Sequence, residues 1–273
     1  MATLAIIAGR GSLPLDIAMA ARASGHDVCL FSLRGQADAD FSAYAHHEID
    51  LGAISKTRSL MVELGCDRLV MAGKVARPSL ASLRPDTDAL KLLGKSFRRG
   101  DDNLLRLVSQ YFADAGIETI SPDNFLPDRR LGSGVVVAGD VDENEARDDI
   151  SLGLSVLANL GNLDVGQSVI VQQGRVIAIE AAEGTDAMIA RAGVLLDSSD
   201  TPGVMIKMPK QSQDIRLDKP VFGVETIKAA AAAGIGVIAL SADGVLLADP
   251  LGDVIVACIG ADITLVGIAV AAT

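Results

Sequence analysis

The chain contains no tryptophan, and only 3% of its 273 residues are aromatic. Because 49% of the residues are nonetheless hydrophobic, the core must be built mainly from aliphatic side chains. Aliphatic strands are typical of parallel sheets that helices cover on both faces. The length also allows two modest domains, since a single hydrophobic core stops growing near this size.

Cysteine and histidine are scarce, with three of each. Cys29, Cys66 and Cys258 lie far apart, which predicts reduced core thiols in a cytosolic protein rather than a disulfide framework or a zinc site. His46 and His47 are adjacent, so on an extended segment they would point to opposite faces, and no histidine has metal-ligand spacing. The sequence also lacks a Gly-x-Ser-x-Gly motif, a Walker loop and a Cys-x-x-Cys pair. Covalent catalysis is therefore not expected, and metal-assisted attack by water fits better.

Cationic residues are fewer than anionic ones: the chain has 24 lysines and arginines and 35 aspartates and glutamates, which gives a net charge of −11. Such a chain repels a phosphate backbone, so no nucleic-acid partner is expected, and electrostatic docking to an anionic membrane is disfavoured. The longest apolar runs, at 229–240 and 263–272, are shorter than the roughly 18–20 residues that span a bilayer. Residues 1–9 carry no secretory signal. We therefore expect a cytoplasmic protein.

Apolar runs alternate with helix-compatible segments, which is the pattern of parallel α/β units. An irregular stretch at 127–139 suits a linker, and the apolar tail at 254–270 does not divide clearly into elements. We predict a two-domain α/β protein, with a small doubly wound, Rossmann-like domain at 1–131 and an α/β domain carrying most catalytic residues at 132–273. The expected strands are 4–8, 27–33, 68–72, 117–120, 168–171, 176–180, 203–207, 236–240 and 245–247, and the expected helices are 15–24, 56–64, 103–115, 143–160, 185–191 and 225–233.

A glycine turn follows the first expected strand. Gly9-x-Gly11 begins a dinucleotide-binding fingerprint, but Pro14 stands where the third glycine would be. Such a turn lets a phosphate approach the backbone and the amides of the next helix. Two alternatives are a structural turn without a ligand, and an NADP enzyme in which Arg34 binds a 2′-phosphate. The candidate substrate-binding residues of the turn are Gly9, Gly11, Ser12 and Leu13.

Carboxylates are dense in the second half of the chain. A hard divalent cation prefers oxygen ligands and bridges protein carboxylates to substrate phosphates. Glu183 and Asp186 are three residues apart, so they can share a turn or a helix face. The simpler alternative is that Asp186 and Glu225 are charges at helix N-termini, where the dipole favours them. The carboxylates of this set are Glu183, Asp186, Asp214, Asp218 and Glu225.

Cations and amides accompany these carboxylates. Lys207 directly follows an apolar strand, which a solvated charged loop does not readily explain. Asp101 or Asp102 is most simply the N-cap of the following helix, although the pair would also complete a site between domains. The density of charge predicts a site for a divalent metal and a phosphate-bearing ligand. The cations and amides that we assign to it are Lys74, Arg77, Lys207, Lys210, Gln213 and Arg216.

Five segments also match one known family in order and in spacing. The chain resembles the UDP-2,3-diacylglucosamine pyrophosphatases of the lipid A pathway over essentially its whole length. The resemblance implies a two-domain α/β hydrolase that cuts the pyrophosphate of UDP-2,3-diacylglucosamine with a divalent metal, giving 2,3-diacylglucosamine 1-phosphate and UMP. It also implies a homodimer with the lipid product bound between the domains. The matching segments are 7–14, 72–78, 100–106, 180–188 and 210–218.

The resemblance assigns roles to the polar residues. Glu225, Asp186 and Glu183 are the expected catalytic residues, with Mg²⁺ or Mn²⁺ held by Glu225 and Asp186. Position 225 departs from the family pattern, in which an aspartate is functionally important, so the role of Glu225 is open. We expect a lipid nucleotide-sugar as the partner, and a transient contact with the inner membrane. The alternatives are a non-enzymatic nucleotide-sugar or lipid-binding protein and the NADP reductase. The remaining substrate-binding candidates are Asp101, Asp102, Thr185, Asp214 and Thr226.

Overall fold

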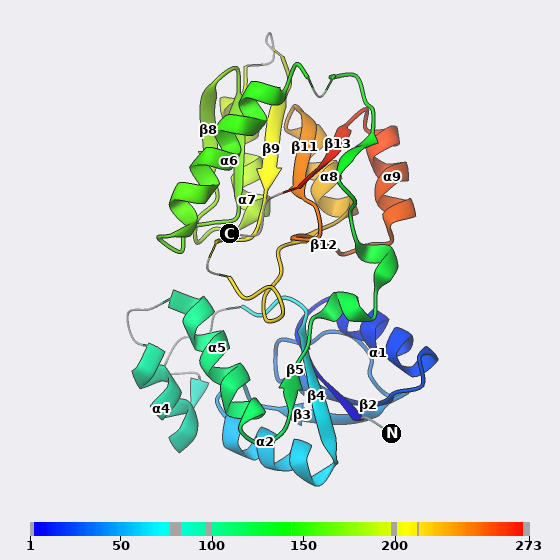
Figure 1. Cartoon of the computed structure of the whole chain (residues 1–273), viewed down its shortest axis with the longest axis vertical. Helices are drawn as coiled ribbons and strands as arrows, with labels where there is room; N and C mark the ends of the chain where they lie inside the picture. The colour runs from blue at the N-terminus through cyan, green and yellow to red at the C-terminus, as the bar shows by residue number, and fades with distance from the viewer. Residues whose placement is uncertain are drawn as a thin grey trace. The chain divides into compact units, whose positions relative to one another are not determined.

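A computed structural model describes residues 3–76, 83–96, 100–142, 144–197, 201–211 and 213–269. The chain forms two compact units (Figure 1), one comprising Met1–Pro127 with Arg216–Asp218 and the other Asp128–Ile215 with Lys219–Thr273. Each unit has its own sheet and helices, so the predicted two-domain α/β class is confirmed. No helix within the described ranges is long and apolar enough to cross a membrane.

The first unit contains a parallel sheet. Its strands are β1 (Thr3–Ala8), β2 (Asp27–Leu33), β3 (Ala45–Ile49), β4 (Cys66–Ala72) and β5 (Glu118–Thr119). Its helices are α1 (Leu13–Ala23), α2 (Ile54–Glu63), α4 (Thr87–Ser96) and α5 (Gly100–Ala113). The strand order β3-β2-β1-β4-β5 is the predicted doubly wound arrangement, with the change of direction between β1 and β4. Phe31, Met61 and Phe112 join the sheet to α2 and α5 in an apolar cluster.

The second unit is built on a mixed sheet with the order β6-β13-β11-β9-β7-β8. These strands are β6 (Gly134–Val137), β7 (Ser168–Gln172), β8 (Arg175–Ile179), β9 (Gly203–Lys207), β11 (Ile235–Ser241) and β13 (Thr264–Ile268), and β10 (Val221–Phe222) pairs separately with β12 (Leu246–Leu247). The helices are α6 (Arg147–Gly161), α7 (Thr185–Leu195), α8 (Val224–Ala232) and α9 (Leu251–Gly260).

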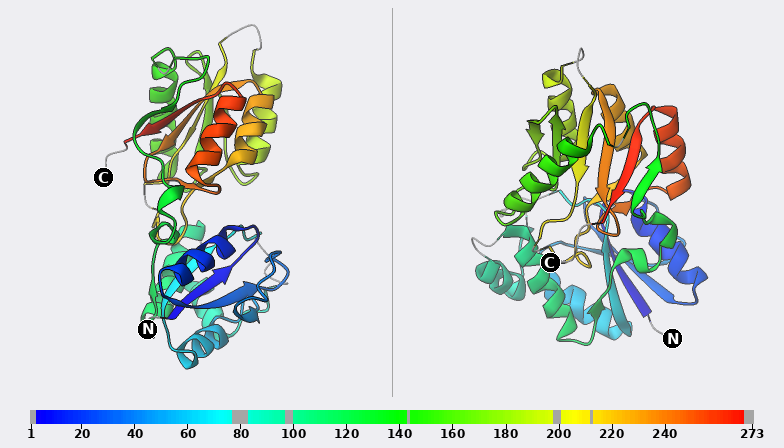
Figure 2. Two further views of the ribbon diagram at one scale, coloured as in Figure 1. Left: turned by 90° about the vertical axis from the view of Figure 1, so that its right-hand side faces the viewer. Right: turned by 45° about the horizontal axis from the view of Figure 1, so that its top comes forward.

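Two apolar layers enclose the second sheet. On one face Met188, Ile227 and Val254 bring α7, α8 and α9 onto the sheet. On the other face Ile150 and Leu157 bring α6 onto it. The left panel of Figure 2 shows α8 and α9 on one side and α6 on the other. Strands β8, β9, β11 and β13 run in one direction, so α7 and α8 both begin at the carboxyl edge of these strands.

Several parts of the chain differ from the sequence prediction, among them β3, α4 and β10, which were not expected. The supposed linker at 127–139 contains β6, which pairs antiparallel with β13. The glycines around Val135–Val137 hide this strand in the sequence, and only the partner strand stabilises it. The undivided tail forms α9 and β13. Helix α5 begins at Gly100, so Asp101 and Asp102 lie in its first turn rather than at the predicted N-cap.

All three cysteines are buried and free, which confirms the predicted core thiols. Burial raises the pKa of Cys66 to about 12 and that of Cys258 to about 11, both from 9.0.

We expect a disulfide reagent at pH 8 to react with these thiols only after guanidinium unfolds the protein. Rapid colour release from the native protein would contradict this. Because the folded thiols hold their protons more tightly, the free energy of unfolding should fall as the pH rises above 9.0.

Candidate active site

The glycine turn of the first unit packs against the loop that follows β4. Arg10 and Lys74 exchange backbone hydrogen bonds of 2.8 and 3.0 Å. A Cβ atom on Gly9 would lie 2.6 Å from the Lys74 carbonyl oxygen and 2.9 Å from Gly73. Glycine at position 9 is therefore required by this loop contact, which supports the interpretation as a structural turn. Leu13 is also largely structural, since it begins α1 with a buried side chain.

Gly11 presents its amide to a carboxylate that sequence reasoning missed. Its backbone N–H donates to Asp38 Oδ1 over 2.8 Å, and Asp38 Oδ2 lies 3.7 Å from Arg10 Nε. Gly11 has φ of 98°, which favours glycine, and a Cβ there would meet no atom within 4 Å. Ser12 lies beside this turn, with its hydroxyl 3.4 Å from Asp16. The turn can thus hold an anionic oxygen, and the one it holds comes from the loop after β2.

Arg34 does not support the NADP alternative. Its guanidinium makes ion pairs with Glu48 at 3.0 Å and with Asp50 at 2.8 Å. Two carboxylates therefore compete with any 2′-phosphate for this cation.

Three side chains form a row at the carboxyl edge of the second sheet. Ser168 and Lys207 are directly paired across β7 and β9, and the Glu180 amide donates to the Ser168 carbonyl over 2.9 Å. Directly opposed residues place their side chains on the same face of a sheet. This face is the one that α7 covers, because Ile170, two residues after Ser168, packs in its apolar cluster.

A continuous hydrogen-bond network joins this row to the start of α7. Lys207 Nζ donates to Thr185 Oγ1 over 2.8 Å and to Ser168 Oγ over 3.3 Å. Thr185 in turn donates to Glu180 Oε1 over 2.8 Å. Lys207 is only 3% exposed, so a positive charge is held inside the protein beside the amides of a helix N-terminus. Buried charges persist when they are hydrogen-bonded and compensated, and the Glu180 carboxylate belongs to the same network through Thr185.

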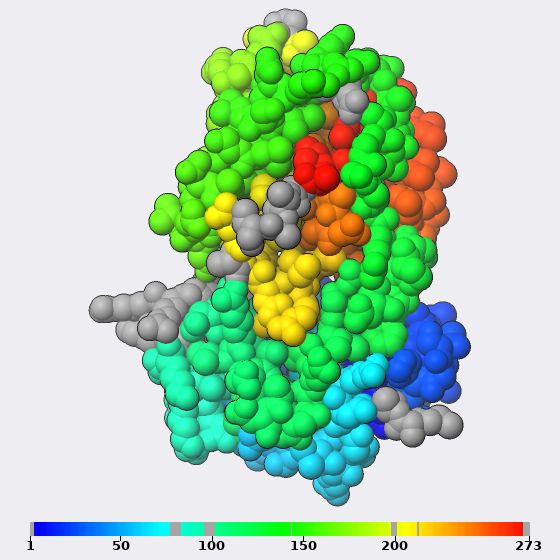
Figure 3. Space-filling view, in the orientation of Figure 1, coloured from blue at the N-terminus to red at the C-terminus, as the bar shows by residue number. Residues whose placement is uncertain are grey.

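A second set of contacts shapes the loop after β9. Gln213 Oε1 accepts from Gln167 Nε2 over 2.8 Å and from the Lys210 amide over 3.1 Å. Lys210 forms an ion pair with Asp164. Two of the predicted ligand-binding residues therefore hold the loop in place. Figure 3 shows that the segment after β9, in yellow, reaches the molecular surface.

The predicted catalytic carboxylates lie near the same edge. Asp186 is in the first turn of α7, and Glu225 and Thr226 are in the first turn of α8. Glu225 has a side chain that is 88% exposed and 2.7 Å from Lys228. The pKa of Glu183 is lowered first by a hydrogen bond from its own backbone amide and then by one from Arg191 over 2.8 Å. Among the described residues, no group of three or more His, Cys, Asp or Glu side chains is arranged to hold a metal ion.

Helix α8 has an acidic partner that the sequence did not reveal. The Val224 amide donates to Asp249 Oδ2 over 2.8 Å, although Asp249 is 25 residues away in the chain. A Cβ on Gly223 would lie 2.6 Å from that oxygen. The helix start next to Glu225 is therefore capped by a distant carboxylate, as the helix dipole favours.

The other predicted residues fall in several places. Asp214 lies in the second unit, whereas Arg216 belongs to the short segment that groups with the first. Asp102 is in the first turn of α5, in the first unit. Arg77 and the side chain of Asp101 lie outside the described residues.

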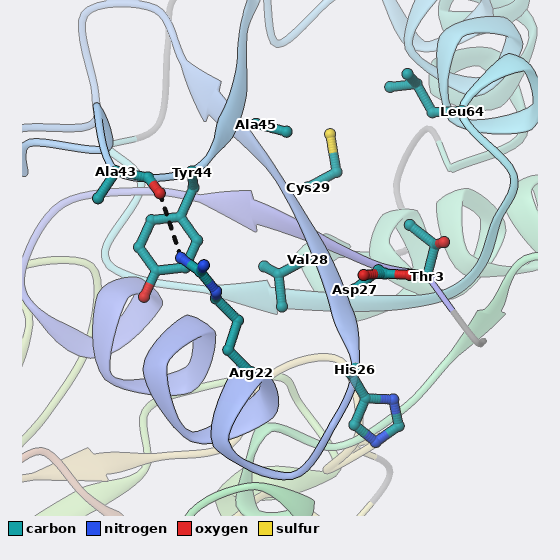
Figure 4. A pocket seen from close by; sticks show the side chains of 10 residues that line it. All are labelled: Thr3, Arg22, His26, Asp27, Val28, Cys29, Ala43, Tyr44, Ala45 and Leu64. Carbon is teal, nitrogen blue, oxygen red and sulfur yellow. Dashed lines mark hydrogen bonds between the residues drawn. The ribbon is translucent and has the colours of Figure 1, made fainter.

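One cavity lies away from all of these residues. A hollow of about 390 Å³ lies at the amino-terminal edge of the first sheet, by the starts of β1, β2 and β3. There the Arg22 guanidinium lies 5.0 Å above the Tyr44 ring and donates to the Ala43 carbonyl over 3.3 Å (Figure 4). None of the predicted site residues lines it.

Comparison with known families resolves the identity of the fold. The chain matches the LpxI N-terminal domain over residues 3–129 and the LpxI C-terminal domain over residues 133–266. The chain belongs to the LpxI family. The predicted resemblance is thereby confirmed, and each of the two LpxI domains corresponds to one sheet with its helices.

A curated LpxI relative is similar along almost the whole chain. It is the UDP-2,3-diacylglucosamine pyrophosphatase LpxI of Caulobacter vibrioides, 36% identical over 262 residues that cover 91% of each protein. Among solved structures, the Bordetella bronchiseptica enzyme WbmH with NAD⁺ is 14% identical over 40% of this chain and 36% of that chain, with a TM-score of 0.27. A glycinamide-RNase-transformylase T from Mycobacterium tuberculosis is 14% identical over 66% of this chain and 44% of that chain, with a TM-score of 0.25. Such low scores support no argument about this LpxI fold.

Proposed function

We propose that the protein hydrolyses the pyrophosphate of UDP-2,3-diacylglucosamine to UMP and 2,3-diacylglucosamine 1-phosphate in lipid A biosynthesis. The observation that carries this proposal is the buried Lys207 at the N-terminus of α7, in a chain 36% identical to a curated enzyme of that activity. A buried cation next to helix amides suits a phosphate whose negative charge grows or moves during the reaction.

Different residues of the chain have different roles in this hydrolysis. Lys207 and the amides at the start of α7 offset charge on the pyrophosphate, and water attacks one phosphorus while the bridging P–O bond breaks. The two products leave as phosphate monoesters and a proton is released. Lys210 and Gln213 hold the loop that follows β9, so their role is to fix the conformation of this loop at the carboxyl edge of the second sheet.

Mg²⁺ or Mn²⁺ fits the carboxylates at this edge. Such a cation uses one or two protein carboxylates together with substrate phosphates and water, so a preformed three-carboxylate cluster is not needed. Asp186 and Glu225 open two helices that pack against each other, and the exposed Glu225 carboxylate can reach a ligand. We propose that these two residues hold the metal, which when bound would polarise the phosphate and acidify water.

The first test is an assay with purified protein and UDP-2,3-diacylglucosamine, with and without EDTA. We expect UMP and the lipid phosphate in equal amounts, and no release after chelation until Mg²⁺ or Mn²⁺ is restored. Release that continues in EDTA would overturn the metal assignment alone. Substrate binding without product under any metal would instead favour the non-enzymatic binding protein.

Asp186→Asn and Glu225→Gln should each lower kcat/KM by about 10²-fold, because each removes a charge that holds the metal near the pyrophosphate. Both helices should still form, since these side chains are in exposed first turns. Steady-state assays over a range of Mg²⁺ concentrations would show a higher metal requirement. Glu145→Gln, an exposed residue of the same unit, is the matched control. Wild-type turnover in both variants would refute the assignment.

We also propose a homodimer that meets its lipid substrate by transient contact with the inner membrane from the cytoplasm. The family resemblance supports this proposal, and so does the outer face of α9, where Val256 and Ile259 are exposed. Light scattering would measure the mass of the protein in solution. Co-sedimentation with lipid vesicles would measure its contact with a membrane. A monomer over the working range of concentration would refute the dimer.

A further inference from the structure

Glu180 lies at the carboxyl edge of the second sheet and has had no role so far in the reaction. It follows β8 directly, and its two carboxylate oxygens accept from two different donors. Oε1 accepts from Thr185 Oγ1 over 2.8 Å, and Oε2 accepts from the Gln167 amide over 3.3 Å. The residue therefore connects the start of α7 to the strand that carries Ser168.

The direction of the hydrogen bonds follows from the chemistry of the groups. The Lys207 ammonium has only donors, so the Thr185 oxygen must accept from it. The single hydroxyl proton of Thr185 then points to Glu180. The carboxylate thus sets the hydroxyl orientation, and the hydroxyl in turn holds the ammonium. Chains of this kind strengthen each bond, because each group polarises the next.

We propose that Glu180 is the positioning residue for Lys207: through Thr185 it aims the buried ammonium at the pyrophosphate and supplies the counter-charge that keeps it buried. This inference rests on the proposed hydrolysis, since the pyrophosphate is the group that the ammonium serves. Glu180 does not touch substrate in this scheme and acts only through Thr185 and Lys207.

A glutamine at position 180 separates this role from simple packing. It has nearly the same shape as glutamate, but it has one acceptor oxygen for the two donors and carries no charge. Either Thr185 or the Gln167 amide then loses its acceptor. The ammonium remains and still attracts the substrate phosphates, but the Thr185 hydroxyl, which donates to Glu180 in the unaltered protein, no longer holds it as firmly.

The kinetic test compares Glu180→Gln and Glu180→Ala with Glu145→Gln, an exposed residue that carries the same substitution. We expect kcat to fall about 10–100-fold in the Glu180 variants, because misplacement of about 1 Å can cost this much. KM should change little, since the charge that attracts the substrate is kept. A wild-type kcat in Glu180→Gln, or a fall that only follows loss of folded protein by circular dichroism, would overturn the proposal.

A second readout does not depend on activity. Brief acetylation with acetic anhydride, read by mass spectrometry, should modify Lys207 little in the native protein and faster in both Glu180 variants. Unchanged labelling in folded Glu180→Gln would overturn the proposal. If the unaltered protein released no UMP, the proposed function would fail, and this labelling would still decide whether Glu180 holds Lys207.

Discussion

Replacement of Lys207 by methionine is expected to lower kcat/KM by about 10³-fold, the upper end of what one stabilising group contributes to a transition state. Methionine matches the apolar stem of lysine but lacks the terminal ammonium, and with it the positive charge that the network surrounds. Glu180 keeps both of its donors, the Thr185 hydroxyl and the Gln167 amide, so the edge should remain folded. Initial-rate assays with saturating Mg²⁺ would measure the loss.

The control for this variant is Lys91→Met, which removes an exposed lysine paired with Asp88 in the first unit. An exposed ion pair of this kind contributes little to stability, so activity and melting temperature should both stay near those of the unaltered protein. If Lys207→Met folded and kept more than a tenth of its kcat/KM, Lys207 would not be the cation that stabilises the reacting phosphate.

Gly166→Ala is expected to cause a large loss of stability at the carboxyl edge of the second sheet. A Cβ at this position would lie 2.0 Å from the Glu180 carbonyl oxygen, and the backbone φ of 60° is unfavourable for alanine. The backbone strain should cost about 1–2 kcal/mol, and the displaced main chain about 1–3 kcal/mol more. Because the displaced residue is Glu180, catalysis should fall together with stability.

Gly174→Ala separates these two causes. Gly174 has φ of 71°, but a Cβ there would meet no atom within 4 Å. It should therefore show the backbone strain alone, about 1–2 kcal/mol. Thermal unfolding of the two variants under the same conditions measures the difference. Equal melting temperatures would show that the contact with Glu180 relaxes without cost.

Local sequence patterns predicted much of the fold. Aliphatic runs separated by glycine turns identified β1, β2, β4, β9 and β11, because buried parallel strands and the turns after them have a strong composition signal. Burial of the three cysteines was predicted from their wide separation, together with the apolar neighbours of two of them. The family followed from short polar segments that appear in order. Strand β6 could not be predicted in this way, since its partner β13 is more than 120 residues away.

The sequence by itself determined the fold class, the family and the position of Lys207 at the end of an apolar strand. Only the tertiary structure decided which groups surround that lysine. Lys207 is 39 residues from Ser168 in the chain, and strand register brings both onto one row with Glu180. The same holds for Asp38 at Gly11 and Asp249 at α8. Hydrogen-bond partners of this kind depend on pairing and packing between distant segments, so local patterns do not encode them.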